Sequence, residues 1–177
     1  MKLILRITLI LFIAFSGINN LSAQKDKAKR KSPPVSVSQT IDDLNITINY
    51  GQPSVNGRVI YGELVPYDQV WRTGANEATT ITFDKDVLIN GSDLLGGGTY
   101  SLFTIPAANG NWVVIFNKVA DQWGAYDYKQ ESDALRINVK ATKNKNIVEK
   151  LNFVINKSGT VVFSWEYLTF SFNVSAS

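Results

Sequence analysis

The regular strand pattern of this chain is interrupted by one dense group of aromatic and polar residues: Trp71, Arg72, Asn76 and Glu77. An indole ring can stack on the apolar face of a sugar or another ring, and a guanidinium can hold a carboxylate in a two-pronged hydrogen bond. The amide of Asn76 and the carboxylate of Glu77 can bind hydroxyl groups. The group is a candidate ligand site, but it also suits a structural role with Trp71 in the core. In that role Arg72 and Glu77 pair with each other or cap backbone groups of a glycine-bent loop.

A second irregular segment, residues 117–128, places Trp123 and Tyr126 on either side of Gly124 and Ala125. Two aromatic rings around small residues would form a platform with a shallow floor, and packing at the edge of the fold is the alternative. Loops on a β scaffold often carry function, and the ligand-site hypothesis requires that the two segments line one recess. The predicted ligand-binding residues are Trp71, Arg72, Asn76, Glu77, Trp123 and Tyr126.

The 177 residues include no histidine and no cysteine. Serine and cysteine nucleophiles activated by histidine, zinc sites built on these two ligands, and disulfides are therefore excluded. Hydrolysis without histidine most often uses two carboxylates, about 5 Å apart in retaining glycosidases and about 6.5–9.5 Å apart in inverting ones. Glu77 and Asp121 are the catalytic candidates, but no motif joins them. A non-catalytic role is favoured, and no cofactor or metal site is predicted.

Hydrophobic residues alternate with polar ones along most of the chain, as at Ile46, Ile48 and Tyr50. No stretch of helical period exceeds about two turns. Two runs, 100–105 and 112–116, are apolar at nearly every position, which predicts strands covered on both faces in the middle of a sheet. We predict an all-β fold, a single antiparallel β-sandwich of jelly-roll type, with a closed β-barrel as the alternative.

The N-terminal region has the pattern of an export signal. An apolar stretch at 3–15 follows Lys2, and its length of about 13 residues is below the roughly 20 that cross a bilayer. We predict a signal peptide at residues 1–23, a basic, proline-containing disordered tether at 24–37, and a single β-rich domain at 38–177. The protein is expected to be exported, periplasmic or secreted, without a permanent membrane span.

Charge is distributed unevenly along the chain. Residues 1–31 contain seven of the 18 basic residues and one of the 15 acidic residues. The remaining 11 basic and 14 acidic residues give the rest of the chain a net charge of −3. Nucleic-acid binding needs a basic face that neutralises phosphates, so no nucleic-acid partner is predicted.

Four stretches resemble a known family: YGQPSVNGRVIYGELVPYDQVWRTGANEATTITF, GGGTYSLFTIP, WVVIFNK and QWGAYDY. They are similar to the exported bacterial family catalogued as domain of unknown function 2911, from about Ser38 to the C-terminus. The resemblance implies a β-rich exported domain. It implies no activity and assigns no catalytic or binding residue.

These features together predict an exported, non-catalytic domain that binds a glycan or a similar polar, ring-bearing ligand. Its predicted partner is a saccharide or another component of the cell envelope. Two other functions fit the same residues. One is a hydrolase that uses loop carboxylates, and the other is a structural or assembly module of the envelope.

Overall fold

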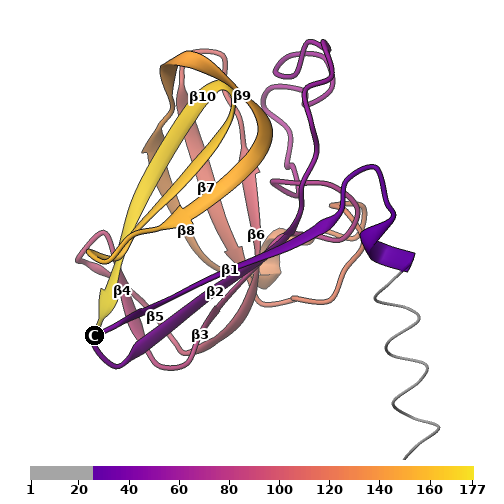
Figure 1. The fold of residues 1–177 in the computed structure, drawn as a ribbon. Helices are drawn as coiled ribbons and strands as arrows, with labels where there is room; N and C mark the ends of the chain where they lie inside the picture. Colours follow the sequence, from indigo (N-terminus) through magenta and orange to yellow (C-terminus); the bar gives the residue numbers. More distant parts are fainter. Residues whose placement is uncertain (1–25) are drawn as a thin grey trace, which may run out of the picture.

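The computed structural model describes residues 26–177 as two antiparallel β-sheets packed face to face (Figure 1). The larger sheet has the strand order β1-β2-β3-β6-β7-β8, and the smaller sheet has the order β5-β4-β10-β9. The larger sheet consists of β1 (Pro34–Ile41), β2 (Leu44–Gly51), β3 (Thr80–Phe83), β6 (Gly98–Ile105), β7 (Asn111–Asn117) and β8 (Asp133–Lys140). The smaller sheet consists of β4 (Val87–Ile89), β5 (Asp93–Leu95), β9 (Thr142–Ile155) and β10 (Thr160–Ala176). The predicted two-sheet sandwich is confirmed, because the strands form two separate sheets.

The period-two pattern builds the main core between the sheets. Successive side chains of a strand point to opposite faces, so β2 sends Leu44, Ile46 and Ile48 inward, where all three are fully buried. On the facing strand β10, Phe163 and Trp165 belong to the same buried cluster. Each fully buried large apolar side chain stabilises the fold by about 1.5–3 kcal/mol. This core holds the chain together without disulfides.

Strands β6 and β7 lie in the middle of the larger sheet and are covered on both faces, as the sequence predicts. Their inner side chains join the main core. Their outer side chains include Phe103 and Ile115, which pack with Ala78 in a second, smaller core. The cover over this outer face comes from the two irregular segments that the sequence indicates, 50–79 and 117–128, through Val70, Ala78, Ala125 and Tyr128. The segments that carry the candidate site are therefore fixed to the sheet by apolar packing.

The outer face of β1, β2, β3 and the start of β6 is polar and faces solvent. Ser38, Thr47, Thr82 and Thr99 are cross-strand neighbours on four adjacent strands. The hydroxyl oxygens of Ser38 and Thr47 are 2.9 Å apart, and those of Thr82 and Thr99 are 3.0 Å apart. A row of hydroxyl groups thus crosses four of the six strands of the larger sheet, beside the part of the sheet that the irregular segments cover.

The basic N-terminal segment is folded against the domain over the residues described. Strand β1 begins at Pro34, inside the region 24–37 for which the sequence predicts a disordered tether. Residues 26–28 form a helical turn beside the loops of the sandwich (Figure 1). The backbone amide of Gln52 donates a 2.9 Å hydrogen bond to the carbonyl of Pro33. Residues 26–33 thus lie against the domain in this structure.

The predicted signal peptide, residues 1–23, lies outside the described residues. Within residues 26–177, no helix is long and apolar enough to cross a membrane. Besides the turn at 26–28, this range contains the 3-10 helix η1 (Gln130–Ser132), which leads into β8.

Candidate functional site

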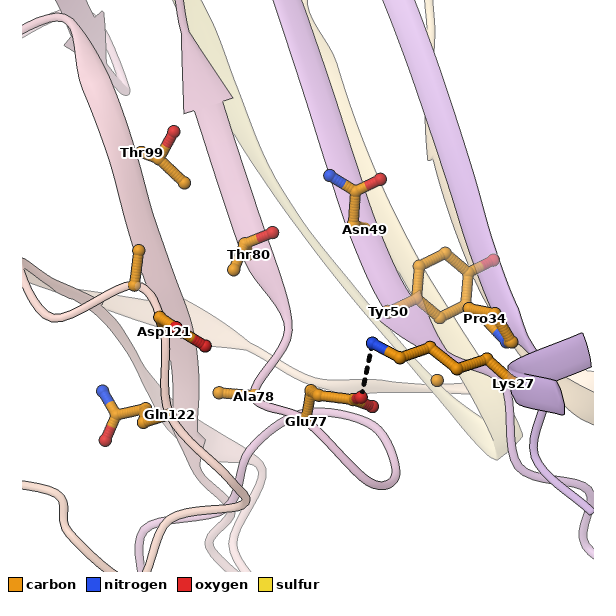
Figure 2. A pocket seen from close by; sticks show the side chains of 12 residues that line it. Lys27, Pro34, Asn49, Tyr50, Glu77, Ala78, Thr80, Thr99, Asp121 and Gln122 are labelled. Carbon is orange, nitrogen blue, oxygen red and sulfur yellow. Dashed lines mark ion pairs between the residues drawn. The ribbon is translucent and has the colours of Figure 1, made fainter. Parts of the chain in front are cut away.

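A pocket of about 330 Å³ opens where the polar outer face of the larger sheet meets the irregular segments (Figure 2). Strands β2, β3 and β6 contribute Asn49, Thr80 and Thr99 to one side. Cross-strand pairing of Asn49 with Thr80 aligns these two side chains on the same face. The full lining consists of Lys27, Pro34, Asn49, Tyr50, Gly51, Glu77, Ala78, Thr80, Thr99, Ala120, Asp121 and Gln122.

Glu77 is held at this pocket by two cations from the N-terminal segment. Lys27 Nζ lies 3.0 Å from its Oε1 atom. Arg30 Nη1 donates to both carboxylate oxygens, at 3.0 Å and 2.8 Å. Partial burial favours the neutral acid, but hydrogen bonds from Arg30, from its own backbone and from Lys27 outweigh burial and lower the pKa of Glu77 to about 2. Glu77 is therefore a fixed negative charge at neutral pH.

Trp123 lies beside Glu77 and does not itself line the pocket. The two residues form an isolated antiparallel bridge, and the neighbouring Gln122 lines the pocket itself. The indole of Trp123 is 53% exposed, and the guanidinium carbon of Arg30 lies 5.8 Å from its ring centroid, within cation–π range. Arg30 thus joins Glu77 to an accessible aromatic ring.

Asn76 and Tyr126 belong to the loops of Glu77 and Trp123 but do not line the pocket. The amide nitrogen of Asn76 donates a 2.9 Å hydrogen bond to the carbonyl of Ser32, which fixes the N-terminal segment at a second point. The carbonyl of Asn76 accepts a 3.1 Å hydrogen bond from the amide of Gly124. Tyr126 is 81% exposed and its ring stands against Gly124, where an added Cβ would lie 3.0 Å from the ring.

Arg72 approaches the loop at Gly124 but does not pair with Glu77. An added Cβ at Gly124 would lie 3.4 Å from Arg72 Nη1, so the guanidinium reaches the loop of Trp123. Arg72 Nε is buried without a hydrogen-bond partner among residues 26–177. Of the two structural roles that the sequence allows for this group, the Arg72–Glu77 pair is absent from the described residues, because Lys27 and Arg30 take its place.

Trp71 is separated from the other predicted residues by the direction of its side chain. Its backbone pairs with Thr104 of β6, and its ring is stacked on Trp165 with centroids 5.8 Å apart and planes 19° apart. Phe163 meets the same indole edge-on at 6.1 Å. Trp71 therefore packs against the main core and does not line the pocket beside Glu77.

Asp121, the second catalytic candidate, lines the same pocket as Glu77 (Figure 2). It is exposed and makes no ion pair within residues 26–177. Two carboxylates therefore share one recess, in very different electrostatic surroundings. Among the described residues, no group of three or more acidic side chains could hold a metal ion.

Sequence reasoning missed the residues that strands and the N-terminal segment bring to the pocket. Asn49, Thr80 and Thr99 are polar positions that point away from the main core, and the alternation pattern alone marks such positions as solvent-facing. Lys27 and Arg30 belong to a basic run whose partner in the fold, Glu77, has no sequence signal. The excess of positive charge in that run beside an acidic domain is the one feature that suggests such an attachment.

Comparison with known protein families shows which family the chain belongs to. Residues 32–174 match the family described as "Protein of unknown function (DUF2911)". The chain belongs to this family. The resemblance predicted from the four sequence stretches is therefore confirmed, and the family's description assigns no activity. Comparison with curated proteins and with solved structures gives no match.

Proposed function

We propose that this DUF2911 protein is a non-catalytic binding domain for a saccharide or a similar polar, ring-bearing ligand. The observation that carries the proposal is the pocket of about 330 Å³ beside the accessible indole of Trp123. Small-molecule sites typically have volumes of roughly 300–1,000 Å³ and combine apolar walls with a few placed polar groups.

The lining of the pocket suits a ligand that carries hydroxyl groups. Asn49, Thr80 and Gln122 offer neutral donors and acceptors, while Asp121 offers a carboxylate acceptor. Pro34, Ala78 and Ala120 supply apolar surface in the same recess. A saccharide presents the matching combination, because its ring has an apolar face and a rim of hydroxyl groups.

The state of Glu77 favours binding over catalysis. A general acid must be protonated at the working pH, which requires a raised pKa, whereas the two cations lower the pKa of Glu77 to about 2. In this proposal Glu77 keeps Arg30 in place over Trp123, and thereby fixes the loop beside the site.

Export is also part of the proposal. It rests on the signal-peptide pattern of residues 1–23, and an exported domain would encounter the saccharides of the cell envelope.

Titration of the protein with N-acetylglucosamine oligomers and neutral glucans tests the proposal, with binding heat as the readout. We expect Asn49→Ala to weaken binding about tenfold, because it removes a donor and acceptor from the pocket wall. Asn138→Ala is the matched control, since Asn138 is an exposed asparagine on β8, outside the pocket lining. Equal affinities of both variants for a binding saccharide, or no heat with any saccharide, would count against the site.

A hydrolase is a second candidate, because Glu77 and Asp121 line one pocket. Glu77 remains ionised, so Asp121 would have to be the proton donor. Release of reducing ends from the same oligomers, abolished in Asp121→Asn, would establish this activity and displace the binding proposal. Binding without any release supports the non-catalytic domain.

A further inference from the structure

A second pocket, of about 360 Å³, lies between the loop at residues 59–67 and strands β9 and β10. It shares no lining residue with the pocket at Glu77. Its wall contains three tyrosines, one carboxylate, one ammonium group and apolar side chains that include Leu168. The titratable lining residues are Tyr61, Tyr67, Lys143, Glu166 and Tyr167.

The backbone that presents Glu166 is irregular. Its φ angle is 55°, in the left-handed region that residues other than glycine, asparagine and aspartate rarely adopt. The pairing of β10 with β9 shifts register on both sides of Glu166, between Ser164 and Glu166 and again between Glu166 and Leu168. Bulges of this kind redirect side chains and are frequent beside binding sites, where strained backbone is retained for function.

The carboxylate of Glu166 is held but not neutralised. Its Oε2 atom accepts a 2.8 Å hydrogen bond from the amide of Tyr167, which fixes the group at the pocket wall. Lys143 lines the same pocket, yet neither residue makes an ion pair within residues 26–177. The pocket therefore contains one negative and one positive group that do not satisfy each other.

Tyr61 forms the deep wall of this pocket. Burial, with smaller effects from the charges of Glu166 and Tyr67, raises the pKa of Tyr61 well above its ordinary value, so its phenol remains neutral. Its hydroxyl lies 3.5 Å from the carbonyl of Trp165, which is longer than an ordinary hydrogen bond. The ring of Tyr61 packs against Trp71, Trp112 and Trp165, so it is a fixed wall of the pocket. Tyr167 is 44% exposed and offers an aromatic ring that can attract a cation.

We propose that this pocket is a second ligand site, for a small zwitterion such as a free amino acid. The ligand's ammonium group would contact Glu166 and the tyrosine rings, its carboxylate would contact Lys143, and its side chain would lie against the apolar wall. This assignment follows from two unpaired charges of opposite sign at one pocket, and it does not depend on the saccharide proposal.

Binding of three related ligands separates the contribution of each charge: L-phenylalanine, phenethylamine and 3-phenylpropionate. We expect phenylalanine to bind, and the singly charged analogues to bind at least about tenfold more weakly, since each leaves one protein charge without a partner. Equal binding of all three ligands, or no binding of phenylalanine up to about 10 mM, overturns the proposal.

Substitutions of Lys143 and Glu166 test whether the ligand binds in the second pocket. Lys143→Met should weaken phenylalanine binding about tenfold, whereas Lys145→Met, on the same strand, should not change it. Glu166→Asn should weaken binding by a similar factor while the melting temperature stays the same or rises, because asparagine tolerates a left-handed backbone. Unchanged binding in Lys143→Met or Glu166→Asn, or weaker binding in the Asn49→Ala variant of the first pocket, would place the ligand elsewhere and reject the assignment.

Discussion

Arg30 and Glu77, 47 positions apart in the chain, form an ion pair in which one guanidinium nitrogen donates to both carboxylate oxygens. This contact attaches the N-terminal segment to the loop that enters β3. The same guanidinium lies over Trp123, so three distant segments meet at one side chain. The candidate site is therefore completed by residues that precede the first strand, and its integrity depends on an electrostatic contact at the surface.

Removing the guanidinium should detach the N-terminal segment. We expect Arg30→Gln to lower the free energy of unfolding by about 0.5–1 kcal/mol, a modest value because the Glu77 side chain is 42% exposed and solvent screens the pair. Urea denaturation measures the loss. Lys29→Gln is the matched control in the same segment, since no ion pair of Lys29 occurs among residues 26–177. Equal losses in both variants would show that the specific pair contributes nothing.

Acid should weaken the same attachment. The pKa of Glu77 in the folded protein is about 2, against an ordinary value of 4.5. A lowered folded-state pKa stabilises the protein above pH 4.5, and this contribution is lost as the pH falls from 4.5 towards 2. We expect wild type to exceed Glu77→Gln by about 1 kcal/mol at neutral pH, after allowance for screening, and the difference to disappear near pH 2. Denaturation curves of both proteins at several pH values measure it, and a constant difference would contradict the assignment.

The two tryptophans of the predicted site should behave in opposite ways when they are replaced. Trp71→Ala should lower the free energy of unfolding by about 2–4 kcal/mol, because the ring is stacked on Trp165 within the core. Trp123→Ala should cost less than about 1 kcal/mol, because its ring is 53% exposed. Thermal or urea denaturation distinguishes them, and similar losses would mean that the ring of Trp123 is also essential for folding.

The strand pattern could be predicted from the sequence, whereas the directions of the Trp71 and Trp123 side chains could not. Alternation at Ile46, Ile48 and Tyr50 was enough to predict strands and a sandwich, because strand geometry alone places those side chains on one face. Trp71 and Trp123 both occur in irregular, glycine-containing segments, where no period indicates the direction of a side chain. Only the position of Trp165 on the opposite sheet decides that Trp71 packs against the core.

The partners of Glu77 illustrate a second limit. One structural role considered from the sequence paired Glu77 with Arg72, five residues away, because short separations are the ones that a sequence displays. The fold instead brings Lys27 and Arg30 to the carboxylate, since β1 places the preceding residues beside the loop before β3. Strand order in a sheet is a tertiary property, and the contacts that depend on it are absent from local patterns.

Trp123 should report ligand binding by its fluorescence. Trp112 and Trp165 are almost fully buried, and Trp71 packs against the core, whereas Trp123 is 53% exposed and adjoins Gln122 of the pocket lining. A bound saccharide should therefore change mainly the emission of Trp123. We expect Trp123→Phe to abolish the emission change while binding heat remains measurable. An emission change of full size in Trp123→Phe would show that the ligand acts on another part of the protein.

The floor of the pocket should not tolerate a larger residue at Gly51. An added Cβ at this position would lie 2.1 Å from the carbonyl oxygen of Ala75, and backbone cannot move aside as a flexible side chain can. Gly51→Ala should therefore displace the loop that carries Asn76 and Glu77, and should lower the free energy of unfolding by about 1–3 kcal/mol. Gly57→Ala provides the comparison, because an added Cβ there has no atom within 4 Å. This variant meets only the cost of a left-handed φ of 67°, about 1 kcal/mol.

Urea denaturation and saccharide titration of both variants separate the effects. Gly51→Ala should lose stability and affinity together, while Gly57→Ala should keep the affinity of wild type. Wild-type affinity in Gly51→Ala would mean that the loop at Glu77 does not shape the binding site.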